Sequence, residues 1–178
     1  MITSLYKEVL HEYVHRLFYP VVAMVITASF ENETAAMLAS SCMPLSLNPP
    51  VVGVAVMKTH RTYRIIKNSN QYAVCWLSLD KLDKLKKLAE KTPDNVRNKL
   101  SYVGFEIRKG RKLPDLPIPA DAGAWIECKV IWSKPVGDHE LFAAHVEAAY
   151  ATEDFNEYWQ YQRYKPTLYI GGKYTTIP

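Results

Sequence analysis

The residues best suited to binding a charged ligand gather between Ser40 and Ile66. This stretch begins with small hydroxyl and thiol side chains, continues through a double proline and an apolar run, and ends in the basic corner Lys58-Thr59-His60-Arg61-Thr62. A helix that starts at this corner directs free backbone N–H groups at an anion, and Arg and Thr add directed donors. Convergence of the serine segment and the basic corner on one anion predicts a site for a phosphate-bearing cofactor.

Two further groups could face a ligand. The turn Gly137-Asp138-His139 precedes the run LFAAHVEAAY, so it could present an imidazole at the mouth of a strand, or it could be a plain hairpin turn. The closing segment 167–174 sets Tyr169 and Tyr174 beside Gly171-Gly172. It could wall an aromatic ligand or form a hairpin with core aromatics. The aromatic segment 151–165 suits a substrate lid or a dimer arm, and the sequence does not decide between them.

Several common sites are not signalled. The chain has no G-x-G-x-x-G, no G-x-x-x-x-G-K-[ST], no H-E-x-x-H and no G-x-S-x-G. The pairs His11/His15 and Glu8/Glu12 have helical i, i+4 spacing, but nothing completes a ligand set. An exposed helix face is therefore the preferred interpretation, and no metal site is predicted.

Composition narrows the class of protein. The chain has 178 residues, which favours one domain over 1–178, with 48% hydrophobic and 22% charged residues. The formal net charge is +4, and the absence of a long Lys/Arg block argues against nucleic-acid binding. No apolar run is long enough to span a bilayer, which argues against a membrane protein.

The cysteines and the N-terminus predict the compartment. Cys42, Cys75 and Cys128 are isolated, their spacing fits no zinc or redox motif, and their odd number favours a reducing compartment. Charged residues interrupt the N-terminal segment, so it lacks the pattern of a signal peptide. We therefore expect a cytoplasmic protein.

Hydrophobic periodicity predicts the elements that position these residues. Helices are expected over 4–17, 60–68 and 80–91, with a short one starting at Thr92-Pro93. Strands are expected over 21–28, 34–41, 51–57, 72–77, 125–132, 141–150 and 168–170, with a long turn over 43–50 and a loop over 108–121. Six or seven strands without regular βαβ alternation predict a mainly β fold, an antiparallel barrel with helical decorations.

Taken together, these motifs resemble the flavin reductase-like family, the FMN-binding split barrels. The resemblance runs from about Tyr19 to Tyr174 and in the family's order. It is carried by PVVAMVIT, AMLASSCMPLSLNPPVVGVAV, KTHRT, VGDHELFAAHVEAAY and LYIGGKY. The S-x-N-P-P-x-x-x-V-x-V and G-D-H-x-L-F portions, at this separation in one chain, are the specific part.

The resemblance implies a split-barrel homodimer with FMN near the subunit interface. It assigns the serine segment and the basic corner to the flavin phosphate and ribityl chain. It places Thr27 near the isoalloxazine, His139 near the flavin or the nicotinamide, and Tyr169 and Tyr174 at the pocket's closure. The implied phosphate and ribityl contacts are Ser40, Ser41, Cys42, Ser46, Lys58, His60, Arg61 and Thr62.

The implied activity is NAD(P)H:flavin oxidoreduction, with hydride passing from a nicotinamide to FMN, or to FAD as an alternative flavin. Such a reaction needs no strong side-chain acid or base, because the cofactors supply the chemistry. Reduced flavin would pass to a partner monooxygenase, or electrons to an acceptor protein. The alternatives are a flavoredoxin-like FMN electron carrier without nicotinamide turnover, and a barrel that has lost flavin and serves as an interaction module.

Overall fold

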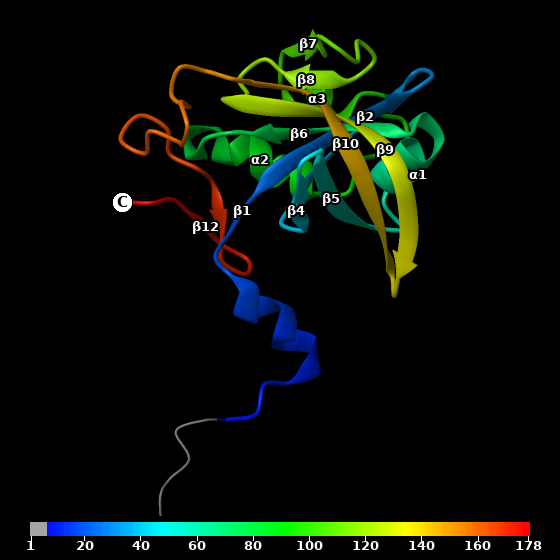
Figure 1. The fold of residues 1–178 in the computed structure, drawn as a ribbon. Coiled ribbons are helices and arrows are strands. Elements are labelled where there is room, and N and C mark those ends of the chain that lie inside the picture. The colour runs from blue at the N-terminus through cyan, green and yellow to red at the C-terminus, as the bar shows by residue number, and fades with distance from the viewer. Residues whose placement is uncertain (1–6) are drawn as a thin grey trace, which may run out of the picture.

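A computed structural model describes residues 7–178 of the chain. Its body is a seven-stranded antiparallel sheet with the strand order β3-β2-β6-β9-β10-β5-β4 (Figure 1). The strands are β2 (Met24–Phe30), β3 (Glu33–Ala39), β4 (Cys42–Leu47), β5 (Pro50–Met57), β6 (Gln71–Trp76), β9 (Ala124–Val136) and β10 (His139–Ala151).

Smaller elements decorate this sheet. A three-stranded sheet contains β1 (Val21–Val22), β11 (Leu168–Tyr169) and β12 (Tyr174–Thr175), and a two-stranded sheet contains β7 (Ile107–Lys109) and β8 (Pro117–Pro119). The helices are α1 (Arg61–Ser69), α2 (Leu82–Ala89) and α3 (Lys99–Val103), with 3-10 helices η1 (His11–Phe18) and η2 (Leu79–Lys81). No helix among the described residues is long and apolar enough to cross a membrane.

The main sheet is strongly curled. Its two edge strands, β3 and β4, follow each other in the chain and are joined only by Ser40 and Ser41. Two residues cannot span a flat seven-stranded sheet, so the sheet bends until these strand ends approach each other. This geometry leaves the outer edge of β3 free to border a ligand site.

Strand alternation divides the interior into two cores. On one face, Ile26, Tyr72 and Phe142 pack with Ile65 and Ile66 of α1. The other face packs against α2 and α3, and its core includes Val25, Cys75, Leu85, Leu88 and Leu100. The strand β3 therefore lies between a helix from one face and two helices from the other.

The expected mainly β, antiparallel fold with helices is confirmed. The strands predicted over 21–28, 34–41, 51–57, 72–77, 125–132, 141–150 and 168–170 are present with shifted ends, as are the helices over 60–68 and 80–91. The hairpin of β9 and β10 is longer than predicted. The outer part of β9 is mostly exposed, so it lacks the apolar pattern from which a strand is recognised.

The long turn predicted over 43–50 is wrong. This segment contains β4, which pairs with β5 from Cys42 opposite Val54 to Leu47 opposite Pro50. The prolines do not prevent pairing, because β4 is an edge strand with one free side and Pro50 is the first residue of β5.

One predicted helix is only partly correct, and another is wrong. Of the helix predicted over 4–17, residues 4–6 lie outside the described residues, 7–10 form no helix, and η1 is a 3-10 helix that leaves the body of the molecule (Figure 1). None of its side chains is buried, so no packing stabilises an α-helix there. No helix starts at Thr92-Pro93; α3 follows Asn98, whose side chain accepts the Ser101 N–H at 3.1 Å.

The loop predicted over 108–121 is only partly correct. Its ends pair as β7 and β8, with Lys109 opposite Pro117 and Ile107 opposite Pro119. A two-stranded sheet has a free edge on each strand, where proline is tolerated.

Candidate functional site

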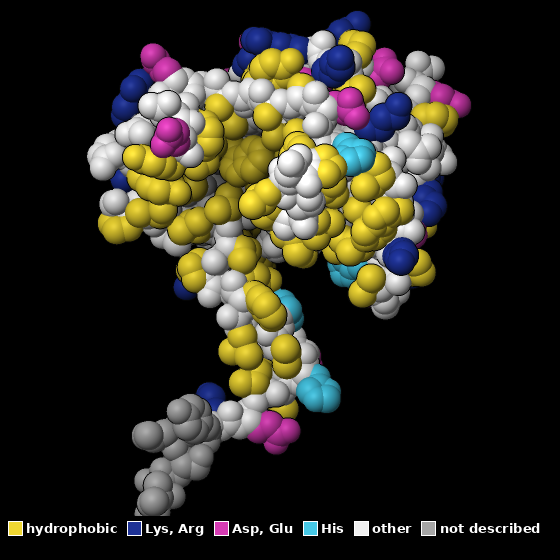
Figure 2. Space-filling model, viewed as in Figure 1, with side chains coloured by type: hydrophobic (Ala, Val, Ile, Leu, Met, Phe, Trp, Pro, Cys, Tyr) yellow, Lys and Arg dark blue, Asp and Glu magenta, His cyan; other side chains and the backbone are white. Residues whose placement is uncertain are grey.

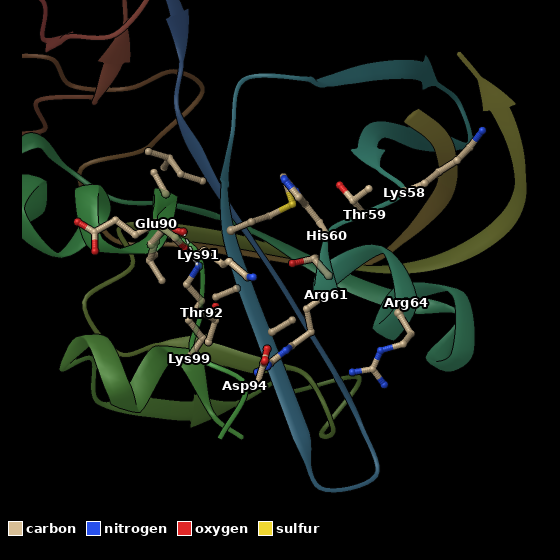
Figure 3. A pocket seen from close by; sticks show the side chains of 17 residues that line it. Lys58, Thr59, His60, Arg61, Arg64, Glu90, Lys91, Thr92, Asp94 and Lys99 are labelled. Atoms are coloured by element: carbon tan, nitrogen blue, oxygen red, sulfur yellow. Dashed lines mark hydrogen bonds between the residues drawn. The ribbon is translucent and has the colours of Figure 1, made fainter. Parts of the chain in front are cut away.

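A cavity of about 860 Å³ lies at the free edge of β3 (Figure 3). It is bordered by β3, by the first turn of α1 and by the segment from the end of α2 to the start of α3. Its volume falls within the range of small-molecule and cofactor sites, about 300–1,000 Å³. The lining residues are Ala35, Ala36, Met37, Leu38, Lys58, Thr59, His60, Arg61, Thr62, Arg64, Leu88, Ala89, Glu90, Lys91, Thr92, Asp94 and Lys99.

The cavity is positively charged, since five Lys or Arg residues line it against two Asp or Glu. The first turn of α1 adds to this field, because His60 at its N-cap makes no side-chain capping hydrogen bond. The nearby N–H groups therefore keep donor capacity for an anion. The basic corner predicted from the sequence lies in this lining, with Lys58, His60, Arg61 and Thr62 all present.

Lys99 differs from the other charged residues of the site in being buried. Its side chain is only 7% exposed, and its Nζ donates to the carbonyls of Leu88 and Glu90, each at 2.7 Å. An ammonium group has three donors, so these two bonds leave one. Within residues 7–178, no carboxylate lies within ion-pair distance of this Nζ, and burial followed by the charge of Arg61 lowers the pKa of Lys99. Two neighbouring cations without a carboxylate partner favour an anionic ligand.

The two arginines of the lining differ in their direction and in their partners. Arg61 extends towards the segment after α2 and donates to the carbonyls of Val96 and, at 3.3 Å, Pro93. Arg64 points away from the cavity centre in Figure 3 and pairs with Glu33 at 2.5 Å. Arg61 therefore shapes the wall of the cavity as well as charging it, whereas Arg64 belongs to a surface ion pair.

The edge of β3 adds backbone hydrogen-bonding groups. In an antiparallel strand these groups point alternately towards and away from the partner strand. Thr34 points away from β2, because its N–H donates to the Arg97 carbonyl at 2.8 Å. Alternation then points the N–H and C=O of Ala36 and Leu38 outward in the same way, and both residues line the cavity.

The turn Gly137-Asp138-His139 meets the basic corner. His139 opens β10 opposite Met57, and the Lys58 Nζ donates to the Gly137 carbonyl at 2.8 Å. The Nδ1 of His139 lies 2.7 Å from the Asp138 carboxylate, which leaves Nε2 for another partner. His139 does not line the cavity, but its charge, after partial burial and together with Lys99, lowers the pKa of His60.

The serine segment lies beside the cavity rather than in its lining. The Ser41 Oγ donates to the Ala55 carbonyl at 2.7 Å, which ties the β3–β4 junction to β5. Burial raises the pKa of the Cys42 thiol to about 12, so Cys42 behaves as a packed apolar group. Ser46 lies on the edge strand β4 opposite Val51, and Ser40 forms the bend before it.

Thr27 and the closing tyrosines are also outside the lining. Thr27 is fully buried in β2 between Ala36 and Ala73, and its Oγ1 has no hydrogen-bond partner. Tyr169 and Tyr174 pack on each other in the small sheet, with ring centroids 5.3 Å apart. In this single chain they form an aromatic hairpin.

Sequence reasoning missed most of the lining outside the basic corner. The β3 residues Ala35 to Leu38 carry no functional side chain, so only the position of β3 at a sheet edge reveals their role. Lys91 ends a lysine-rich run that is typical of a solvated helix face, and Lys99 follows an ordinary helix cap. Nothing in the spacing of these residues signals the cavity.

The fold and site define a mainly antiparallel β protein with a basic ligand cavity at one sheet edge. The sequence profile of the flavin reductase like domain matches residues 15–178, and the chain belongs to this family. It is 29% identical to the NADH-dependent flavin reductase StyB of Pseudomonas fluorescens, over 91% of this chain and 85% of that protein. An uncharacterised Aeropyrum pernix protein is 30% identical over 90% of this chain, which spans 61% of that protein's length.

Solved structures show the same fold. The flavoredoxin of Methanosarcina acetivorans superposes with a TM-score of 0.84 at 21% identity, over 97% of this chain and 92% of that one. The flavin reductase PheA2 superposes with a TM-score of 0.76 at 26% identity, over 96% and 99% of the two chains.

Proposed function

We propose that the chain binds FMN in the cavity at the β3 edge and transfers hydride from NADH or NADPH to the flavin. The observation that carries this proposal is Lys99, a buried ammonium group beside Arg61 with a free donor and no carboxylate partner among the described residues. The phosphate of FMN supplies the negative charge that this pair of cations lacks. FAD is the alternative flavin.

The cavity fits FMN in its chemistry as well as its charge. The imide edge of a flavin carries two carbonyl groups and one N–H, which complement backbone groups like those of Ala36 and Leu38 on a free strand edge. The α1 turn, Arg61 and Lys99 would hold the phosphate, at the opposite chemical end of the ligand. Flavin specificity would thus come from backbone groups, which explains why few side chains signal it.

The protein's own contribution to the reaction is binding and orientation. When bound, the flavin supplies the redox chemistry, and no residue needs to act as a strong acid or base. The neighbouring His139 is held by Asp138 with its Nε2 available, so it would orient an incoming polar group at the junction of β5 and β10. The serine segment would support this corner through Ser41 rather than bind phosphate itself.

The purified chain mixed with free FMN and with NADH or NADPH tests the activity. We expect flavin-dependent loss of nicotinamide absorbance, with reduced flavin passing to a monooxygenase or another acceptor protein. Absence of nicotinamide oxidation with both nucleotides would contradict the reductase proposal. A yellow protein that lacks this turnover would support the second candidate, an FMN electron carrier, which the structural likeness to a flavoredoxin favours.

Assembly and location are part of the same proposal. We expect a cytoplasmic homodimer in which a second subunit completes the closure of the flavin site. Exposed apolar side chains on the edge strand β4 and the outer part of β9 support an interface there, among them Leu47, Met43, Trp132 and Val136. Sedimentation of the purified chain tests this expectation, and a monomer at all concentrations would contradict it.

A further inference from the structure

A second cavity, here called the aromatic slot, lies where β6 and β10 end and β9 begins. Its volume is about 320 Å³, and it lies between the sheet and the segment that follows β10. Figure 2 shows hydrophobic side chains gathered around a hollow on this face of the molecule. The slot and the flavin cavity have no lining residue in common. The slot is lined by Trp76, Ala124, Trp125, Ile126, Ala149, Tyr150, Ala151, Phe155 and Trp159.

The outer wall of the slot is held by its own hydrogen bonds. The Thr152 N–H donates to the Gly123 carbonyl at 2.8 Å, and the Gln160 N–H donates to the Asp154 carbonyl at 2.8 Å. Arg163 then pairs with Asp154 at 3.0 Å and with Glu153 at 3.3 Å. The aromatic segment 151–165 therefore folds into a fixed loop, and its rings need little ordering when a ligand arrives.

The rings of this wall are fixed as well. The Trp159 indole stacks on the buried Tyr164 ring with centroids 4.0 Å apart, and Phe155 meets Trp159 edge-on at 5.3 Å. Gly123 allows this packing, because a Cβ at that position would lie 2.8 Å from the Tyr164 ring. The wall consequently stands as a rigid aromatic surface.

The floor of the slot is flat. Ala149 lies opposite Ile126, and Ala151 lies opposite Ala124, which in turn lies opposite Trp76. Cross-strand partners and residues two apart share one face of a sheet. Three of these five side chains are single methyl groups, so a planar molecule can lie close to the strands between Trp76 and the outer wall.

We propose that the aromatic slot binds a small, uncharged, planar aromatic molecule of one or two fused rings. No Lys, Arg, His, Asp or Glu lines the slot, so a charged ligand would lose water without gaining a partner. An apolar cavity of about 150 Å³ holds benzene in another protein, and this volume is about twice as large. Rings stacked on fixed aromatic side chains gain stabilisation that puckered rings of equal size do not.

Titration of the native chain with matched small molecules tests the proposal. Phenol and cyclohexanol compare a planar ring with a puckered one, and benzamide and benzoate compare a neutral ligand with a charged one. We expect phenol and benzamide to bind at least about fivefold more tightly than their partners. Calorimetry measures the affinities, and tryptophan fluorescence reports the place, because Trp76 and Trp159 line the slot.

Substitutions on the floor locate the binding. Ala149→Leu and Ala151→Leu fill the slot from exposed positions that tolerate a larger side chain, and each should weaken phenol binding at least about tenfold. Glu147→Leu, at an exposed position of β10 outside the slot, is the matched control and should bind as the native chain does. Thermal unfolding confirms that each variant is folded, and FMN affinity should stay unchanged in all three.

Three results would overturn the proposal. The first is equal affinity for planar and puckered rings, or no binding of either. The second is phenol binding that survives both floor substitutions in folded protein. The third is a native dimer that dissociates with Ala149→Asp, because a second copy of the chain would then occupy the slot. Loss of FMN binding alone would bear on the flavin site and leave this proposal standing.

Discussion

Two buried charges, Glu127 in β9 and Lys99 in α3, differ in how they are satisfied. Glu127 is fully buried in β9 and accepts the backbone N–H groups of Arg111, Lys112 and Leu113 and the Trp125 Nε1–H, at 2.6 to 3.0 Å. Lys99 is almost as buried but makes two bonds, only to carbonyls. Burial alone does not distinguish a structural charge from a binding one.

The pKa directions express the same difference. Burial raises the pKa of Glu127, but the donors from Leu113, Trp125, Arg111 and Lys112 outweigh it, and the net pKa is lowered. For Lys99, burial and the charge of Arg61 prevail, and the pKa is lowered as well. The charged form of Glu127 is therefore stabilised by the fold, whereas the charged form of Lys99 is destabilised until an anion joins it.

The largest expected effect comes from removing Glu127, the buried charge that the fold itself satisfies. Glu127→Ala removes the acceptor of four donors and leaves the 111–113 turn without partners, so we expect a loss of roughly 3 kcal/mol in the free energy of unfolding. Urea unfolding measures it. A loss below about 1 kcal/mol would contradict the structural role.

The fall in the free energy of unfolding at low pH provides a control for this prediction. Because the pKa of Glu127 is lowered in the folded state, its contribution is present above the ordinary glutamate range and is lost as pH falls through the folded pKa. The stability of Glu127→Gln should fall less steeply on acidification than that of the native chain.

Arg61→Ala tests the proposed phosphate contact, and its expected effect is intermediate in size. We expect FMN affinity to fall about five- to tenfold and riboflavin affinity to fall less, because only FMN carries the phosphate. Fluorescence titration with both flavins measures the two affinities. Arg61 also bonds the carbonyls of Val96 and Pro93, so a modest loss common to both flavins is expected from the looser wall. Equal weakening of FMN and riboflavin would mean that Arg61 does not read the phosphate.

The pH dependence of flavin affinity sharpens the contrast. Since the pKa of Lys99 is lowered, its charge is lost at a lower pH than that of an ordinary lysine, and the preference for FMN should decline over that range as pH rises. Over the same range, a rise in pH increases the free energy of unfolding, because the unfolded chain holds the Lys99 proton more tightly than the folded chain does. Affinity and stability should therefore move in opposite directions.

The smallest effect is expected at Arg64, which serves as the matched control for Arg61 on the same helix. Although Arg64 lies at the rim of the cavity, its guanidinium points away from the cavity centre and pairs with Glu33 at the surface. Arg64→Met should change FMN affinity by less than about twofold and stability by less than about 1 kcal/mol. A tenfold loss of FMN affinity would contradict the distinction between the two arginines.

The sequence predicted the fold better than it predicted the site. Apolar runs identify β2, β5, β6 and β10, because burial on both faces of a sheet favours a nearly continuous apolar sequence. The sequence did not predict β4 and β8, because edge positions tolerate prolines that would stop an inner strand.

For the site, the basic corner was predictable because its side chains carry the chemistry. The edge of β3 was not, because its contribution is made by backbone groups next to alanine and leucine side chains. Lys99 was not, because its burial depends on the packing of α2 against α3, which no local pattern records. The sequence therefore predicted the positive charge of the site, but not the strand edge and the buried lysine that complete its lining.

Comparative titration of the native chain and Lys99→Met with FMN and riboflavin tests the central claim most directly. We expect the native chain to prefer FMN at least about tenfold and Lys99→Met to lose most of that preference, as removal of a charge-assisted hydrogen bond implies. Lys86→Met, at an exposed position of α2 outside the cavity, is the control and should keep the native preference. Equal affinity of the native chain for both flavins, or an unchanged preference in folded Lys99→Met, would contradict the account.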